Sequence, residues 1–164
     1  MSRPSWDQIW IDFAHMISQR SIDPKHKVGA VIVTSDNTQV LALGYNGDHK
    51  GGPNVRDSMR HGHSGLIHAE INALRNASKN TNNYRLNDCL MYVTLEPCHM
   101  CAKAAIDARI SSIVFAAKEP KTGSIVSIDN FLDKKIFNHN VTYRFGLMER
   151  RSSKLLKKFF KLRR

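Results

Sequence analysis

Short apolar runs alternate with helical segments along most of this chain, and that alternation limits the folds it can adopt. A Ser5-x-x-Gln8 capping box precedes apolar residues at helical spacing, which predicts a helix over residues 6–19. The apolar runs at 28–34 and 40–45, separated by turn-forming residues, predict a β-hairpin. Further on, the pattern predicts a helix, a strand, a helix and a strand, in that order, over residues 68–77, 89–94, 97–108 and 113–116. This order favours a single α/β domain spanning residues 1–164.

Composition and the first residues bear on where such a protein works. With 41% hydrophobic and 24% charged residues, the chain has the composition of an ordinary globular protein. Its apolar runs are far shorter than the roughly 20 residues that a membrane helix needs. The N-terminal sequence Met-Ser-Arg-Pro-Ser-Trp-Asp is polar and charged where a signal peptide has its apolar stretch. We therefore expect a cytoplasmic protein without membrane association.

The net charge of +11 is concentrated at the C-terminus. Residues 150–164 hold eight of the 25 Lys and Arg residues and no acid, so the rest of the chain carries only +3. Leu155, Leu156, Phe159 and Phe160 fall on one stripe at helical spacing, which predicts a basic closing helix. Such a helix could bind the phosphates of a polynucleotide. The alternative is a solvated basic face whose apolar stripe packs on the core.

Two short motifs carry the chemistry. His68-Ala-Glu70 opens one predicted helix, and Pro97-Cys98-His-Met-Cys101 opens another. Cys98 and Cys101 lie one turn apart on one helical face, and the positive end of the helix dipole favours thiolates there. Two thiolates and one imidazole give zinc three protein ligands and an open fourth position, which is typical of catalytic zinc. Glu70 projects from a different side of its helix than His68, which suits a carboxylate that transfers protons rather than a fourth ligand.

Each motif alone has a simpler explanation. A Cys-x-x-Cys pair can be a redox pair or half of a structural zinc site, and His-x-Glu is common by chance. The combination, in this order and context, favours catalytic zinc, one ion per chain, because it is the signature of zinc nucleobase deaminases. Cys89 lies within an apolar strand and is expected to be a core residue. We assign no role to His15, His99 or His139.

A long segment, residues 47–67, separates the hairpin from the first motif. It holds five of the nine glycines and three histidines and shows no periodicity. Loops of this length inside a domain are usually functional or disordered. Lys50, Arg56, Arg60 and the backbone amides could bind a single 5′-phosphate, and the histidines could bind phosphate or a second metal. A solvated loop is the simpler interpretation.

With these motifs, the chain resembles the cytidine and deoxycytidylate deaminase superfamily over nearly its whole length. The first half, with Gly44-Tyr-Asn-Gly47 and Ile67-His-Ala-Glu-Ile-Asn72, is similar to deoxycytidylate deaminases. The second half, with Thr94-Leu-Glu-Pro-Cys98 and Lys118-Glu-Pro-Lys-Thr-Gly123, is similar to bacterial tRNA-specific adenosine deaminases. The resemblance implies a three-layer α/β/α fold, with a mixed five-stranded sheet and helices on both faces. It also implies a homo-oligomer, with a dimer as the first expectation.

The resemblance also implies substrate contacts. Asn46 matches a residue that contacts the nucleotide, and Val28 with the backbone of Ala69 matches the wall around the base. In the tRNA enzymes, the segment matching residues 118–123 and the last helix approach the nucleic acid. The matching cations are Lys118, Lys121, Lys154, Lys157, Lys158, Lys161, Arg163 and Arg164. Two departures stand out, because the 47–67 loop is longer than the adenosine enzymes' usual connection and Glu119 stands where they commonly have Asp.

The favoured hypothesis is zinc-dependent conversion of adenosine to inosine in nucleic acid of the tRNA type, because the basic tail and the second-half motifs agree. The alternative is deamination of deoxycytidylate or of another cytosine substrate, which the long loop favours. A remote alternative is a zinc-stabilised RNA-binding module without turnover. The intact Glu70 argues against that module, because zinc binding does not require this carboxylate.

Overall fold

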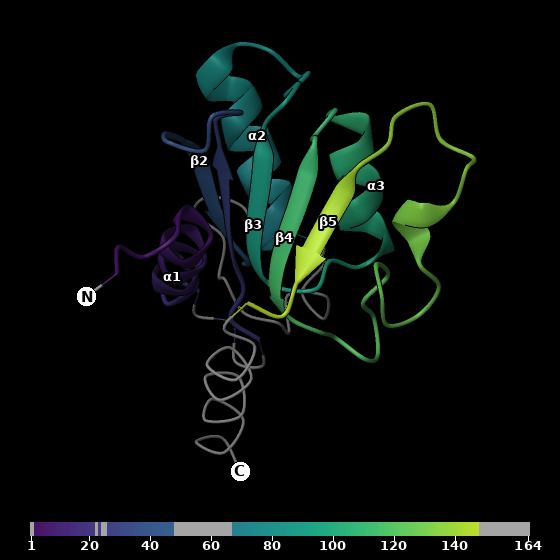
Figure 1. Ribbon diagram of the computed structural model, residues 1–164, viewed down its shortest axis with the longest axis horizontal. Helices are drawn as coiled ribbons and strands as arrows, with labels where there is room; N and C mark the ends of the chain where they lie inside the picture. Colours follow the sequence, from purple (N-terminus) through teal and green to yellow (C-terminus); the bar gives the residue numbers. More distant parts are fainter. Residues whose placement is uncertain (1, 22, 24–25, 48–66, 148–164) are drawn as a thin grey trace, which may run out of the picture.

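The protein folds around one mixed β-sheet (Figure 1). The structure is a computed structural model, and the description covers residues 2–21, 23, 26–47 and 67–147. The strands follow the order β2-β1-β3-β4-β5 across the sheet. Strand β1 runs antiparallel to both β2 and β3, whereas β3, β4 and β5 are parallel to one another. Their bounds are β1 (Gly29–Val33), β2 (Val40–Tyr45), β3 (Leu90–Leu95), β4 (Ser112–Ala117) and β5 (Thr142–Phe145).

Helices cover both faces of this sheet, which confirms the expected three layers. Helix α1 (Trp6–Ser18) packs its buried face against Val31, Val33 and neighbours on one face. Helices α2 (Ala69–Thr81) and α3 (His99–Asp107) cover the opposite face, where the other residues of the same strands point. The capping box predicted for α1 is present, since the Ser5 hydroxyl accepts from the Gln8 amide and the Gln8 side chain accepts from the Ser5 amide.

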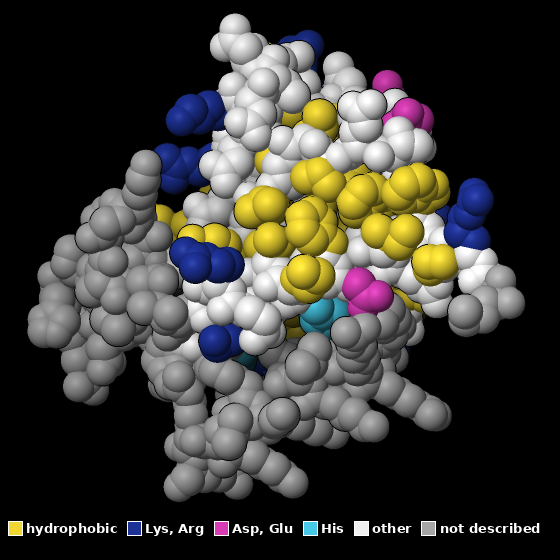
Figure 2. All heavy atoms as spheres, turned by 90° about the vertical axis from the view of Figure 1, so that its left-hand side faces the viewer, with side chains coloured by type: hydrophobic (Ala, Val, Ile, Leu, Met, Phe, Trp, Pro, Cys, Tyr) yellow, Lys and Arg dark blue, Asp and Glu magenta, His cyan; other side chains and the backbone are white. Residues whose placement is uncertain are grey.

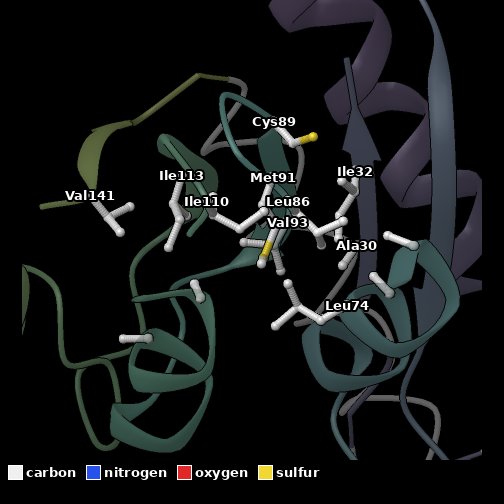
Figure 3. Close-up of a cluster of buried hydrophobic side chains, with 14 of the residues drawn as sticks. Ala30, Ile32, Leu74, Leu86, Cys89, Met91, Val93, Ile110, Ile113 and Val141 are labelled. Carbon is white, nitrogen blue, oxygen red and sulfur yellow. The ribbon is translucent and has the colours of Figure 1, made fainter. Parts of the chain in front are cut away.

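The larger part of the core lies between the sheet and α2 and α3 (Figure 3). Ile32, Met91, Val93 and Ile113 project from three neighbouring strands, and Leu74 meets them from α2. Cys89 belongs to the same cluster and is 8% exposed, which confirms the prediction of a core cysteine.

The elements predicted within the described residues are all present, with shifted ends. Helix α2 continues to Thr81, four residues past its predicted end, and stops where Asn82 adopts the left-handed region with φ of 51°. The residue pattern did not predict strand β5 or the short 3-10 helix η2 (Phe131–Asp133). The expected basic closing helix and nearly all of the 47–67 loop lie outside the described residues. Across the described ranges, no helix has the length and apolarity to cross a membrane.

A ladder of asparagine side chains joins α2 to the edge strand β2. The side-chain amides of Asn72, Asn76 and Asn80 donate to the carbonyl oxygens of Tyr45, Leu43 and Leu41 respectively, each at 2.9 Å. The spacing fits because four helical residues rise about 6 Å, close to the roughly 6.6 Å of two strand residues. The ladder therefore fixes the helix that begins at the first motif along the edge of the sheet.

One face of the molecule carries a cluster of hydrophobic side chains. Figure 2 shows hydrophobic side chains gathered on the side that holds α1 and β2. Trp6, Met16 and Val40 are exposed large hydrophobic residues of these elements, and Trp6 stacks on Trp10 with ring centroids 5.4 Å apart.

Candidate active site

The two motifs meet because they begin the two helices on the same face of the sheet. His68 is the N-cap residue of α2, and Cys98 is the N-cap residue of α3, which follows β3 directly. Neither side chain caps its own helix, so both are available for other contacts. Helices α2 and α3 pack against each other. The positive ends of both helix dipoles consequently stabilise negative charge at the same place.

His68, Cys98 and Cys101 form a compact group of ligand atoms. Nδ1 of His68 lies 3.6 Å from Sγ of Cys98 and 3.4 Å from Sγ of Cys101. All three ligand atoms lie within 4.8 Å of one another. This separation suits one ion bound to all three, because zinc binds sulfur at about 2.3 Å and nitrogen at about 2.0 Å. Three ligands leave a fourth tetrahedral position for a water molecule or substrate.

The electrostatics of the group favour a cation. Hydrogen bonds from Cys101 and His68 lower the pKa of the Cys98 thiol to about 3, so Cys98 is a thiolate at neutral pH. The hydrogen bond with Cys98 raises the pKa of His68. The hydrogen bond with Cys98 and burial raise the pKa of Cys101, and repulsion from the negative charges of Glu70 and Cys98 adds to the rise. A divalent cation would remove that repulsion and favour both thiolates.

Glu70 is buried beside this group. It lies in the first turn of α2 and is 5% exposed. Burial raises the pKa of its carboxyl above the ordinary value of 4.5, and a hydrogen bond with Cys101 places the carboxyl next to the ligands. A carboxyl whose pKa is moved toward neutrality is suited to accept and return a proton. The structure thus brings together all four residues of the predicted catalytic and metal group.

The residues predicted to contact the nucleotide lie just before β1, just after β2 and at the start of α2. Asn46 uses its side chain locally, since Oδ1 accepts from the Val28 amide and Nδ2 donates to the His26 carbonyl, both at 2.8 Å. Val28 is half-buried against the core cluster, and Ala69 is fully buried as the first residue of α2. Asn46 therefore shapes the segment before β1, and a contact with substrate remains a prediction.

Glu96 is a buried residue of the site region that the sequence did not single out. It is 3% exposed, and its carboxylate accepts from the amides of Glu119, Val126 and Ser127 at 3.0, 2.7 and 2.9 Å. The Ser127 hydroxyl also donates to it. Burial raises the pKa of Glu96, but these hydrogen bonds, led by that of Ser127, outweigh burial and leave the pKa below its ordinary value. One carboxylate, two residues before Cys98, thus holds both ends of the segment between β4 and η2.

The same segment presents the cations expected to meet nucleic acid. Lys118 follows β4 and is exposed, as is Lys121. Gly123 packs so closely that a Cβ atom there would overlap the carboxyl group of Glu96. The six other predicted cations lie at positions 154–164, outside the described residues.

The fold and this group of ligands define a zinc-binding deaminase domain. The chain belongs to the cytidine and deoxycytidylate deaminase family, whose zinc-binding region matches residues 4–117.

The named relatives include both tRNA-specific adenosine deaminases and a deoxycytidylate deaminase. A tRNA-specific adenosine deaminase of Haemophilus influenzae is 47% identical over 97 residues, or 59% of this chain and 56% of its own length. That of Buchnera aphidicola is 38% identical over 84% of this chain and 76% of its own length. A deoxycytidylate deaminase of Pongo abelii is 35% identical over 67% of this chain and 64% of its own length. For the Haemophilus and Pongo proteins, the match therefore covers less than two thirds of the relative.

Solved structures show the same fold. One from studies of A-to-I editing by tRNA:A34 deaminases has a TM-score of 0.72 at 28% identity, covering 90% of this chain and 98% of its own. The dCMP deaminase of the cyanophage S-TIM5, in complex with dCMP and dUMP, has a TM-score of 0.68 at 24% identity. It covers 88% of this chain and 99% of its own.

Proposed function

We propose that this protein is a zinc-dependent hydrolytic deaminase that converts adenosine to inosine in RNA of the tRNA type. The observation that carries the proposal is the buried Glu70 beside His68, Cys98 and Cys101. A structural zinc site does not need this carboxylate. Burying a carboxyl group costs free energy, and such groups are typical of sites where the carboxyl takes part in the chemistry.

In this proposal, His68, Cys98 and Cys101 hold the zinc ion. A zinc ion so bound lowers the pKa of a water molecule toward neutrality and polarises it for attack. Water adds to the ring carbon that carries the amino group, and ammonia leaves. Glu70 accepts one proton of that water and passes it to the adjacent ring nitrogen. It then takes the remaining proton of the added hydroxyl and transfers it to the amine, so that the C=O bond forms as the C–N bond breaks. Its raised pKa suits both the acceptance and the return of the proton.

Adenosine in RNA is the favoured substrate for two reasons. Relatives named tRNA-specific adenosine deaminase align over as much as 84% of this chain. In addition, exposed Lys118 and Lys121 lie on the segment that Glu96 ties to the start of α3, where an RNA phosphate could be neutralised. Each phosphate contact on a single strand adds about 0.7 to the salt dependence of binding.

Deoxycytidylate deamination is the second candidate, because the Pongo abelii relative bears that name and is 35% identical. The deciding experiment offers zinc-loaded protein an adenosine-containing tRNA anticodon stem-loop and deoxycytidylate in parallel, and measures ammonia release. Release from the stem-loop alone supports the proposal. Release from deoxycytidylate alone would reassign the substrate to the second candidate.

We also propose a homo-oligomer, with a dimer as the first expectation. Figure 2 shows hydrophobic side chains gathered on the side that holds α1 and β2, and this apolar patch is a surface that a second copy could cover. Trp6 and Met16 of α1 and Val40 of β2 are exposed large hydrophobic residues of these elements. Light scattering of the zinc-loaded protein tests this, and a monomeric mass at working concentration would contradict it.

A further inference from the structure

An exposed aromatic ring lies at the end of the edge strand β5. Phe145 is the last residue of this strand and is 43% exposed. Its ring stacks on that of Phe115, which is fully buried, with centroids 5.4 Å apart and an angle of 9° between the planes. The stacking fixes the ring in place but leaves part of it exposed to solvent, so a flat apolar surface is available for contact with another ring.

This ring lies on the same face and at the same end of the sheet as the proposed active site. Phe145 pairs with Phe115 in register, and the Phe115 side chain faces the core under α2 and α3. Strands β3, β4 and β5 are parallel, so Phe145 and the chain leading from β3 to Cys98 lie at the same end of the sheet, where these strands finish. Two strand spacings separate β3 from β5, which is about 10 Å. A short stretch of single-stranded RNA spans such a distance.

The surroundings of Phe145 are basic and open. Nζ of Lys118 lies over the ring, 5.1 Å from its centroid, and the Lys118 side chain is exposed. The next residue, Gly146, has φ of 89°, and among the described residues no heavy atom lies within 4 Å of the place where its Cβ would stand. An exposed ring and an exposed cation therefore lie next to each other.

We propose that Phe145 and Lys118 form a subsite for a nucleotide that flanks the target adenosine in single-stranded RNA. The base stacks on Phe145, and Lys118 leaves the ring to bind a neighbouring phosphate. Aromatic stacking with a nearby cation is how proteins bind single strands without reading the sequence. The inference rests on the proposed function for its substrate class, and it adds a contact that a free nucleotide or nucleoside cannot make.

The test measures binding of a fluorescein-labelled tRNA anticodon stem-loop to zinc-loaded protein, in a Glu70→Ala background so that nothing is turned over. Phe145→Leu keeps an apolar residue on the strand but removes the ring. It should weaken binding about five- to one-hundred-fold, as loss of one stacked base does. Phe145→Tyr should restore it. Lys118→Gln should lower the slope of log affinity against log salt by about 0.7.

The matched control is a second exposed pair of the same chemistry. Tyr84 is 65% exposed with Arg85 over its ring at 5.4 Å. It lies between the end of α2 and the start of β3, so it is near the N-terminal end of the parallel strands, whereas Phe145 is at their C-terminal end. Tyr84→Leu should leave the affinity unchanged. If Phe145→Leu binds as tightly as Tyr84→Leu, the inference is overturned.

Turnover separates this inference from the proposed function. Ammonia release from the stem-loop by wild-type protein, together with unchanged binding in Phe145→Leu, would refute the subsite and leave the function standing. Ring-dependent binding without ammonia release would support the subsite and refute the proposed reaction.

Discussion

Replacing Glu96 by Gln should destabilise the protein although the two side chains have nearly the same shape. The carboxylate accepts three backbone amides and one hydroxyl. In Gln, the side-chain oxygen can still accept hydrogen bonds from the backbone N–H groups of Val126 and Ser127. The side-chain NH2 group then faces the backbone N–H of Glu119, and two donors cannot bond to each other. The Ser127 hydroxyl can rotate to accept from the NH2 group. Loss of the Glu119 bond and of the charge on the others should cost about 2 to 3 kcal/mol, given 1.5–3 kcal/mol for a hydrogen bond to a charged group.

Urea unfolding of zinc-loaded protein, followed by tryptophan fluorescence, measures this loss. Asp107→Asn is the matched control, because that carboxylate is exposed and pairs only with Lys103 among the ion pairs described, so its loss should cost less than about 1 kcal/mol. Glu96→Gln should also speed tryptic cleavage after Lys118 and Lys121, because the segment is released at both ends. A loss below about 0.5 kcal/mol with unchanged cleavage would refute the reasoning, since a bond to a charged group should cost more.

Three further predictions test other parts of the structure. Asn76→Asp places an acceptor against the Leu43 carbonyl, so it should cost about 1 kcal/mol at neutral pH and less in acid, where the protonated carboxyl can donate; urea unfolding at both pH values measures it. Burial and the hydrogen bond to Asp7 raise the pKa of Tyr92 above its ordinary value of 10.0, so the folded state holds that proton more tightly than the unfolded state. Stability should therefore fall as pH rises above 10, and the fall should be smaller in Tyr92→Phe; parallel declines in the two proteins would contradict this. Cys98→Ala should lose zinc by elemental analysis and melt at a lower temperature, because ligation energy is partly folding energy, whereas Cys89→Ser should keep its zinc.

The fold was predictable where the residue pattern is strongly periodic. The capping box at Ser5 and the apolar spacing after it predicted α1 to within a residue of its end. The β-branched runs predicted the hairpin, although not the irregularity between Ile32 and Val33. Strand β5 gave no such signal, because three of its four side chains are exposed and no alternation results. Its place in the sheet depends on parallel pairing with β4, which is a tertiary effect.

The candidate site likewise contains residues that the sequence predicted and one that it did not. His68, Glu70, Cys98 and Cys101 were predictable because metal chemistry restricts the residue types and their spacing. Glu96 was not, since its partners lie 23 to 31 residues further along the chain and are mostly backbone amides. A glutamate between the end of an apolar strand and Pro97 was the available signal, because a carboxylate in such a place needs partners if it is buried. The asparagine ladder was not predicted either, because its partners are backbone carbonyls of β2, 27 to 39 residues earlier in the chain. The four-residue spacing of Asn72, Asn76 and Asn80 is nevertheless visible in the sequence.

The most direct test of the account compares ammonia release from the anticodon stem-loop by wild-type protein and by Glu70→Gln, with zinc content measured in both. We predict equal zinc and a loss of turnover of at least about 100-fold in the variant, because Glu70 moves the protons and does not hold the metal. Turnover at the wild-type rate by zinc-loaded Glu70→Gln would contradict the central claim.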